Sequence, residues 1–149
     1  MQNYKELKVW MKAHLFTLKI YEVSKPFPKE EFYGLTNQLR QAASSIPANI
    51  AEGCGKNSQN EFAPFLNTAL GSANEAEYFL ILSKDLKYLD EERFLELSEN
   101  INEIKGMLIS LISKVRMIKT YNVQLMTLFD VYPINDVTIV KAKGSYVWD

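Results

Sequence analysis

Four polar residues in the segment around Pro47 are the first candidates for chemistry in this chain. On a helical wheel Gln38, Ser45, Asn49 and Glu52 line up along one edge of an apolar seam. Serine acts as a nucleophile and glutamate as a general base only when another group activates or orients them. The one histidine, His14, belongs to an earlier apolar segment, and Ser45 has no GxSxG context. We interpret the four residues as a structural polar strip and expect no catalytic residue.

Metal and phosphate chemistry also lack their usual residues. One cysteine, Cys54, and one histidine fall short of a zinc site, and Cys54 has no partner for a disulfide bond. The glycines that flank Cys54 do not match the GxxxxGK[ST] pattern of a phosphate loop. We therefore expect no metal, no cofactor and no enzymatic activity.

Charge is distributed unevenly along the chain. Residues 1–57 hold eight Lys/Arg against five Asp/Glu, a net charge of +3, whereas residues 58–104 hold three against ten, a net charge of −7. Two interpretations remain open: ordinary solvated helix faces, or association in which the acidic part of one subunit meets the basic part of another. Four lysines at helical spacing form a narrow stripe and are tentative nucleic-acid-binding residues: Lys5, Lys8, Lys12 and Lys19.

Apolar residues recur at spacings of three and four, which predicts helices over most of the chain. Pro28 favours the start of the second helix, with Phe32 as the first residue of its core seam. Ser58 and Glu61 match a capping box, and Leu89 with Phe94 matches a hydrophobic staple around Asp90. The four helices are expected over residues 5–24, from near Pro28 to Gly53, 58–87 and 90–119.

Short connections between four long helices predict an all-α fold, an antiparallel up-down-up-down four-helix bundle. We assign residues 1–119 to the bundle domain and residues 120–149 to a C-terminal extension outside it. The start of this extension can prolong the fourth helix by a few turns. Alternating β-branched residues around Val137, Ile139 and Val140 then favour a strand.

The first helix has two apolar faces. Val9, Ala13, Phe16, Ile20 and Val23 form one face, which fits the bundle core. A helix with two apolar faces has two surfaces to pack against, of which one is the bundle core and the other is a candidate contact for a second subunit. Its residues are Leu7, Met11, Leu18 and Tyr21, with Trp10 and His14 beside them.

Pro47 lies in the middle of the second helix. It has no N–H to donate to the Ala43 carbonyl, and its ring crowds that carbonyl, so we predict a kink. Nearby hydroxyl groups can bond to the local backbone and favour the bend. We expect Pro47 and the polar strip to shape the bundle or its oligomer.

A longer pattern around Pro47 resembles a known family. The chain reads SSIPANIAEG and then ALGSANE, in the order S-I-P-x-N-I-A-E-G followed by A-x-G-S-x-x-E. This pattern resembles the small four-helix-bundle proteins encoded in intervening sequences of bacterial 23S rRNA genes. That family includes the accessory variability proteins of diversity-generating retroelements. The resemblance covers about residues 4–118.

The resemblance implies a ring-like homo-oligomer, typically a homopentamer, without established enzyme activity. In the retroelement members the oligomer binds a reverse transcriptase and nucleic acid through basic surface. On this pattern Arg40 lies at a basic position of LxxQLR, and Lys56 lies where a basic residue follows the EG turn. Both join the lysine stripe as tentative nucleic-acid-binding residues.

Two functions remain open after these observations. The first is a non-enzymatic homo-oligomeric adaptor that binds RNA, DNA or a nucleic-acid enzyme such as a reverse transcriptase. The alternative is an oligomeric scaffold with a protein partner only. No apolar run approaches the length of a membrane span, and the N-terminus does not resemble a signal peptide, so we expect a cytoplasmic protein without membrane partners.

Overall fold

The structure is a computed structural model that describes residues 2–131, with side chains as far as residue 117. It is built from helices. Two short 3-10 turns precede or separate the long helices: η1 (Tyr4–Glu6) and η2 (Lys29–Glu31). The four α-helices are α1 (Lys8–Ser24), α2 (Leu35–Cys54), α3 (Gln59–Asp85) and α4 (Glu91–Val131).

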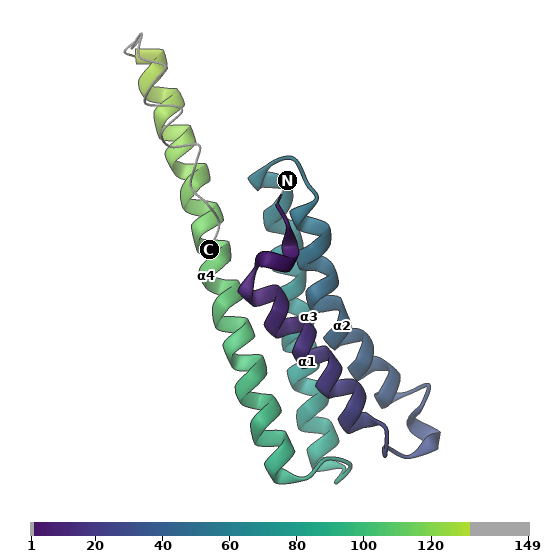
Figure 1. The fold of residues 1–149 in the computed structure, drawn as a ribbon. Helices are drawn as coiled ribbons and strands as arrows, with labels where there is room; N and C mark the ends of the chain where they lie inside the picture. The colour runs from purple at the N-terminus through teal and green to yellow at the C-terminus, as the bar shows by residue number, and fades with distance from the viewer. Residues whose placement is uncertain (1, 132–149) are drawn as a thin grey trace.

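The four helices form an antiparallel up-down bundle, which confirms the predicted fold class (Figure 1). Each helix lies against the helices next to it in sequence, and α1 also lies against α4; α1 and α3 lie diagonally, with no Cα atoms within 8 Å of each other. All four contribute to one core. Its largest fully buried apolar side chains are Phe16, Ile20, Leu39, Ile46, Ile50, Leu66, Leu80, Leu97, Ile101, Ile104 and Leu108.

The predicted start of the second helix is wrong. The chain after Pro28 makes the turn η2, and α2 begins only at Leu35. Glu31 explains the delay, because its Oε2 accepts a hydrogen bond of 2.9 Å from the Leu35 N–H and so caps α2. Phe32 therefore precedes the helix and is 54% exposed, so it is not the first residue of the core seam.

Two predicted helix starts are confirmed by their hydrogen bonds. The Glu61 N–H donates to Ser58 Oγ at 3.3 Å, and Glu61 Oε2 accepts from the Asn57 N–H at 3.2 Å rather than from Ser58. The Arg93 N–H donates to Asp90 Oδ1 at 2.8 Å, with Leu89 buried beside it. These side chains satisfy N–H groups that the first helical turn leaves without partners.

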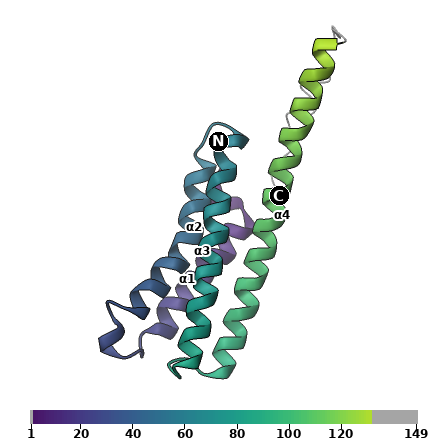
Figure 2. The same ribbon diagram turned by 180° about the vertical axis from the view of Figure 1, so that it is seen from behind.

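The fourth helix extends beyond its predicted end at residue 119. It has 41 residues and continues without interruption to Val131. Figures 1 and 2 show the C-terminal part of α4 leaning away from the other three helices and projecting beyond the end of the bundle. The last of its buried core residues is Val115. The predicted domain boundary falls within this helix, and the strand predicted around Val137 lies outside the described residues.

Candidate functional site

The Pro47 segment is held by a hydrogen bond from another helix. Pro47 cannot donate to the Ala43 carbonyl, and Ala43 is fully buried, so water cannot replace the missing donor. The Thr17 hydroxyl of α1 lies 3.0 Å from that carbonyl oxygen and 2.9 Å from the oxygen of Ala13. Because the Ala13 carbonyl can also accept the Thr17 N–H in the helix, Ala43 is the acceptor that depends on the hydroxyl.

This contact links the Pro47 segment of α2 to α1. The freed carbonyl of α2 and the hydroxyl of α1 form a polar link inside an apolar interface. A helix with an ordinary residue at position 47 would have no free carbonyl there. α2 continues as a helix on both sides of Pro47. The kink at Pro47 stays a prediction.

The polar strip divides into two parts. Asn49 Nδ2 donates to the carbonyl oxygen and to Oγ of Ser45, at 2.8 and 2.9 Å. The Ser72 hydroxyl of α3 donates to Ser45 Oγ at 2.9 Å, so this part links α2 to α3. Gln38 and Glu52 are exposed and do not join these bonds. Sequence analysis missed Ser72 as a partner, because helical spacing says nothing about which helix lies opposite.

The geometry around Ser45 does not resemble a nucleophile with its base. His14 lies on α1, where its ring stacks on Trp10 with 5.2 Å between centroids. Cys54 is buried at the end of α2, and burial raises the pKa of its thiol to about 11, which keeps it protonated. Among residues 2–117 no group of three or more His, Cys, Asp or Glu is placed to hold a metal ion.

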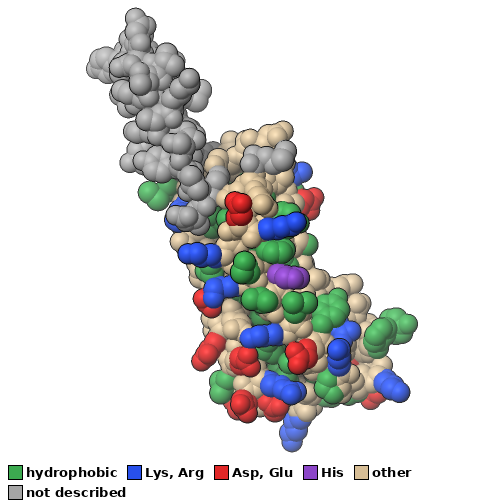
Figure 3. Space-filling model, viewed as in Figure 1, with side chains coloured by type: hydrophobic (Ala, Val, Ile, Leu, Met, Phe, Trp, Pro, Cys, Tyr) green, Lys and Arg blue, Asp and Glu red, His purple; other side chains and the backbone are tan. Residues whose placement is uncertain are grey.

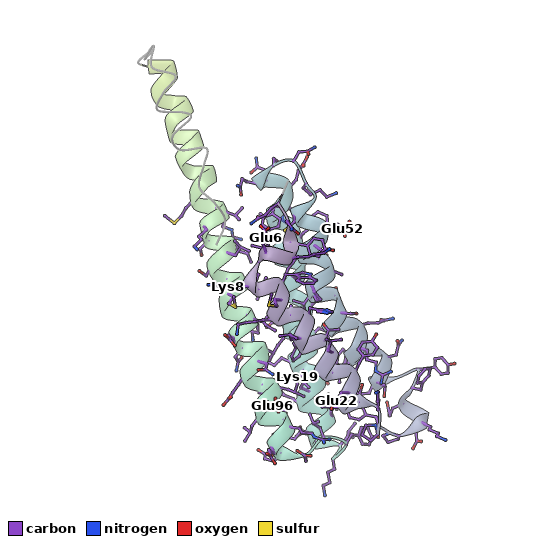
Figure 4. The ribbon with its side chains drawn as sticks, viewed as in Figure 1. Glu6, Lys8, Lys19, Glu22, Glu52 and Glu96 are labelled. Atoms are coloured by element: carbon purple, nitrogen blue, oxygen red, sulfur yellow. The ribbon has the colours of Figure 1, made fainter. Side chains whose placement is uncertain are left out.

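The lysine stripe is partly neutralised by α4. Lys12 Nζ lies 2.7 Å from Glu103 Oε1, and Lys19 Nζ lies 2.8 Å from Glu96 Oε1. Figure 4 shows Lys19 and Glu96 facing each other across the two helices, with Lys8 further along α1. Lys5 and Lys8 form no salt bridge with any residue that the structure describes. The stripe is therefore a mixed-charge seam with a basic end.

Arg40 and Lys56 do not extend the stripe into one surface. Arg40 crosses from α2 to the end of α1, where Nε donates to Ser24 Oγ at 2.8 Å and Nη2 donates to the Tyr21 carbonyl at 3.3 Å. A cation at a helix C-terminus also interacts favourably with the helix dipole. Lys56 lies in the turn between α2 and α3, 5.1 Å from the ring centroid of Phe65. The six basic residues thus occupy three separate places.

The outer face of α1 is an exposed apolar surface that the bundle core does not use. We call Met11, His14, Leu15, Leu18 and Tyr21 the α1 outer face. Its four apolar side chains are 45–53% exposed. Figure 3 shows hydrophobic side chains around the histidine on this side of the molecule, with Lys, Arg, Asp and Glu around them. Leu15 belongs to this face although the sequence analysis did not include it, whereas Leu7 is buried in the core.

Comparison with known proteins shows to which family this chain is similar. A sequence model of the 23S rRNA-intervening sequence protein family matches residues 5–110. The chain belongs to this family. A solved member from Bacteroides thetaiotaomicron, described as a protein of unknown function from the S23 ribosomal protein family, is 31% identical. The match covers 70% of this chain and 97% of that one, with a TM-score of 0.65.

The family match confirms the resemblance inferred from the sequence pattern. It stops before the second half of α4, so the projecting part of that helix lies beyond the matched residues. No curated protein matches the chain. Among the described residues no helix is both long enough and apolar enough to cross a membrane.

Proposed function

We propose that this family member is a non-enzymatic homo-oligomeric scaffold that assembles through the α1 outer face. The observation that carries the proposal is the exposure of Met11, Leu15, Leu18 and Tyr21 on one helix whose opposite face is already buried in the core. A contiguous exposed apolar face on a small protein favours association. The homopentamer implied by the family resemblance is one assembly that would bury it.

A second copy is the favoured occupant because the opposite side of the bundle is complementary. α3 lies diagonally across from α1, and its outer side carries exposed Tyr78 and Ile81 near exposed Glu75 and Asp85. On the α1 side lie Lys8 and two further lysines, Lys12 and Lys19. These two form exposed salt bridges with α4. Contact between two different faces is head-to-tail, and such contacts form rings when the rotation between subunits closes.

Binding of RNA or DNA is the second candidate function. It rests on Lys5 and Lys8, which lie at one end of the stripe and form no salt bridge among the described residues. In an oligomer this basic end would repeat once per subunit. Such a surface could also receive a nucleic-acid enzyme such as a reverse transcriptase. The bonds of Lys12, Lys19 and Arg40 within the chain make the scaffold the better supported function.

Light scattering on variants of the α1 outer face tests the scaffold. Leu18→Asp places a carboxylate on the apolar face, so the particle mass should fall. Asn37→Asp, at an exposed polar position of α2, is the matched control and should leave the mass unchanged. Unchanged mass in Leu18→Asp, with helicity retained by circular dichroism, would overturn the proposed interface.

The same samples test nucleic-acid binding. A short RNA and a short DNA are added at low and at moderate salt. Binding through phosphate contacts should weaken steeply as salt rises, and Lys5→Ala with Lys8→Ala should weaken it further. Absence of binding at low salt would rule out this second function and leave the scaffold in place.

A further inference from the structure

A groove with an apolar floor lies between the start of α1 and the middle of α4. Its volume is about 430 Å³. Leu7, Val9 and Leu111 form the floor and are each at most 5% exposed, and Met107 packs beside them. Pockets that bind small molecules have volumes of about 300–1,000 Å³, a mostly apolar lining and a few polar groups. The groove fits this description.

Gly106 keeps the groove open. It lies in the interior of α4 and lines the groove, and a Cβ placed on it would meet no atom within 4 Å. Gly53 is different, because its missing side chain gives room to Phe62 and Phe65. A glycine inside a helix is destabilising relative to alanine, and no contact within the described chain requires one at position 106. The space beside Gly106 is therefore free for a molecule outside the chain.

The polar groups of the groove are mainly basic. Lys8 and Lys114 line it together with Ser110. Lys8 lies at the start of α1, next to α4 (Figure 4), and forms no salt bridge with any residue that the structure describes. The carboxylate of the lining belongs to Glu103 and is bound to Lys12 at 2.7 Å. A negatively charged group would therefore be attracted to this groove.

We propose that the groove binds a linear acyl carboxylate, a ligand of the fatty-acid class. The lining extends along α4 from Glu103 to Lys114, which is about 16 Å at the helical rise of 1.5 Å per residue. The acyl chain lies on the apolar floor beside Gly106. Its carboxylate lies at Lys8 and Lys114, so the one charge of the ligand meets the basic groups of the groove.

The floor selects an acyl chain over a peptide segment. Leu7, Val9 and Leu111 present apolar side chains that form no hydrogen bonds. An extended peptide laid on them would leave N–H and C=O groups without partners, which costs free energy. An acyl chain has no such groups along its length. The site is separate from the proposed scaffold interface, because no residue of the α1 outer face lines the groove.

Isothermal titration calorimetry of the full chain with dodecanoate tests the site. The fatty acid is kept below its micelle concentration, and circular dichroism checks that the bundle stays folded. We expect saturable binding of one dodecanoate per chain. Two control ligands separate the chain from the charge: acetate has the carboxylate alone, and dodecyltrimethylammonium has the same acyl length with a cationic head. Neither should bind saturably.

A leucine at Gly106 gives the sharpest variant. Gly106→Leu places a side chain in the groove and should abolish saturable binding. Gly71→Leu is the matched control, because a Cβ there also meets no atom within 4 Å but lies on α3, away from the groove. Leucine favours a helix over glycine, so both variants should melt at or above the wild-type temperature. Lys8→Gln should weaken binding about tenfold, the effect of losing one charge-assisted hydrogen bond.

Four results would overturn the proposal. The first is wild-type affinity in Gly106→Leu, and the second is an equal loss in both leucine variants. The third is equal affinity for the cationic ligand, which would mean that the apolar surface binds detergents without a defined site. The fourth is a full chain that does not bind dodecanoate; if removal of residues 132–149 then produced binding, those residues would be the occupant of the groove.

Discussion

The hydroxyl of Thr17 in α1 replaces the N–H that Pro47 lacks in α2. Pro47 leaves the Ala43 carbonyl without its helical donor, and the hydroxyl of Thr17 is the group that reaches it. A buried carbonyl without a partner costs about 1–3 kcal/mol of stability, so the hydroxyl and the proline depend on each other. Packing between α1 and α2 thus gives the proline of the SIP motif a structural explanation.

The dependence of Thr17 on Pro47 can be measured with a double-mutant cycle. Thr17→Val keeps the shape of the side chain but removes the donor, and should lower the free energy of unfolding by about 1–3 kcal/mol. In the Pro47→Ala background the new N–H satisfies Ala43, so the same change should cost less. Urea denaturation of the four proteins gives the coupling energy. Equal costs of Thr17→Val in both backgrounds would contradict the proposed dependence.

Cys54 provides a second prediction at the scale of one residue. Burial raises the pKa of its thiol from 9.0 to about 11. At pH 8 the thiolate fraction should then be about 100-fold lower than in the unfolded chain, since each unit is a factor of ten. Reaction with a disulfide reagent should be at least that much slower in the native protein than in urea.

The same shift has a consequence for stability. The unfolded chain loses the Cys54 proton above pH 9.0 while the folded chain retains it up to about pH 11. The contribution of Cys54 to stability is therefore complete below pH 9.0 and falls as pH rises through this window. Cys54→Ala should flatten the alkaline fall of the melting temperature. A native thiol that reacts as fast as the unfolded one would contradict both statements.

At the scale of elements, the approach of α2 to α3 depends on Gly53. A Cβ placed there would lie 2.8 Å from Phe62 Cδ2 and 2.8 Å from Phe65 Cβ, closer than such atoms come in proteins. The last turn of α2 therefore packs directly on the first turns of α3. This close contact gives the glycine of the family pattern a packing role.

Alanine substitutions at two helical glycines test this packing. Gly53→Ala should destabilise the bundle by about 1–3 kcal/mol, because the two phenylalanine side chains must shift. Gly71→Ala, in the interior of α3 with open space around it, is the matched control and should stabilise by about 0.5–1 kcal/mol. Thermal melts would show opposite shifts. A Gly53→Ala protein as stable as the wild type would show that α2 and α3 are not in close contact there.

Helical spacing in the sequence predicted the positions of the helices better than it predicted which helices contact each other. The four helices were predicted from apolar residues that repeat every three or four positions, and the starts of α3 and α4 from the capping residues Ser58 and Asp90. The start of α2 was not predicted correctly, because Glu31 caps the helix from a turn in which apolar residues do not recur at helical spacing. The links from Thr17 to Ala43 and from Ser72 to Ser45 also escaped, because they depend on which helices lie side by side.

For the whole molecule, the sequence predicted the bundle and its family but could not predict the state of its charges. The lysine stripe is real, yet Lys12 and Lys19 bind glutamates that lie far along the sequence on α4. Exposed pairs of this kind contribute about 0.2–1 kcal/mol each, so they do little for stability but remove positive charge from the surface. Of the α1 outer face, the sequence analysis grouped Met11, His14, Leu18 and Tyr21 because these residues are local in sequence, but the structure was needed to show that this face is the exposed one.

Self-association is the property on which the proposed scaffold depends. Sedimentation equilibrium of the unmodified chain over a range of concentrations measures it directly. Because one chain has a mass of 17.2 kDa, we expect a defined multiple of that mass at micromolar concentration. A mass of 17.2 kDa throughout the range would contradict the proposed scaffold and leave the α1 outer face to a different protein.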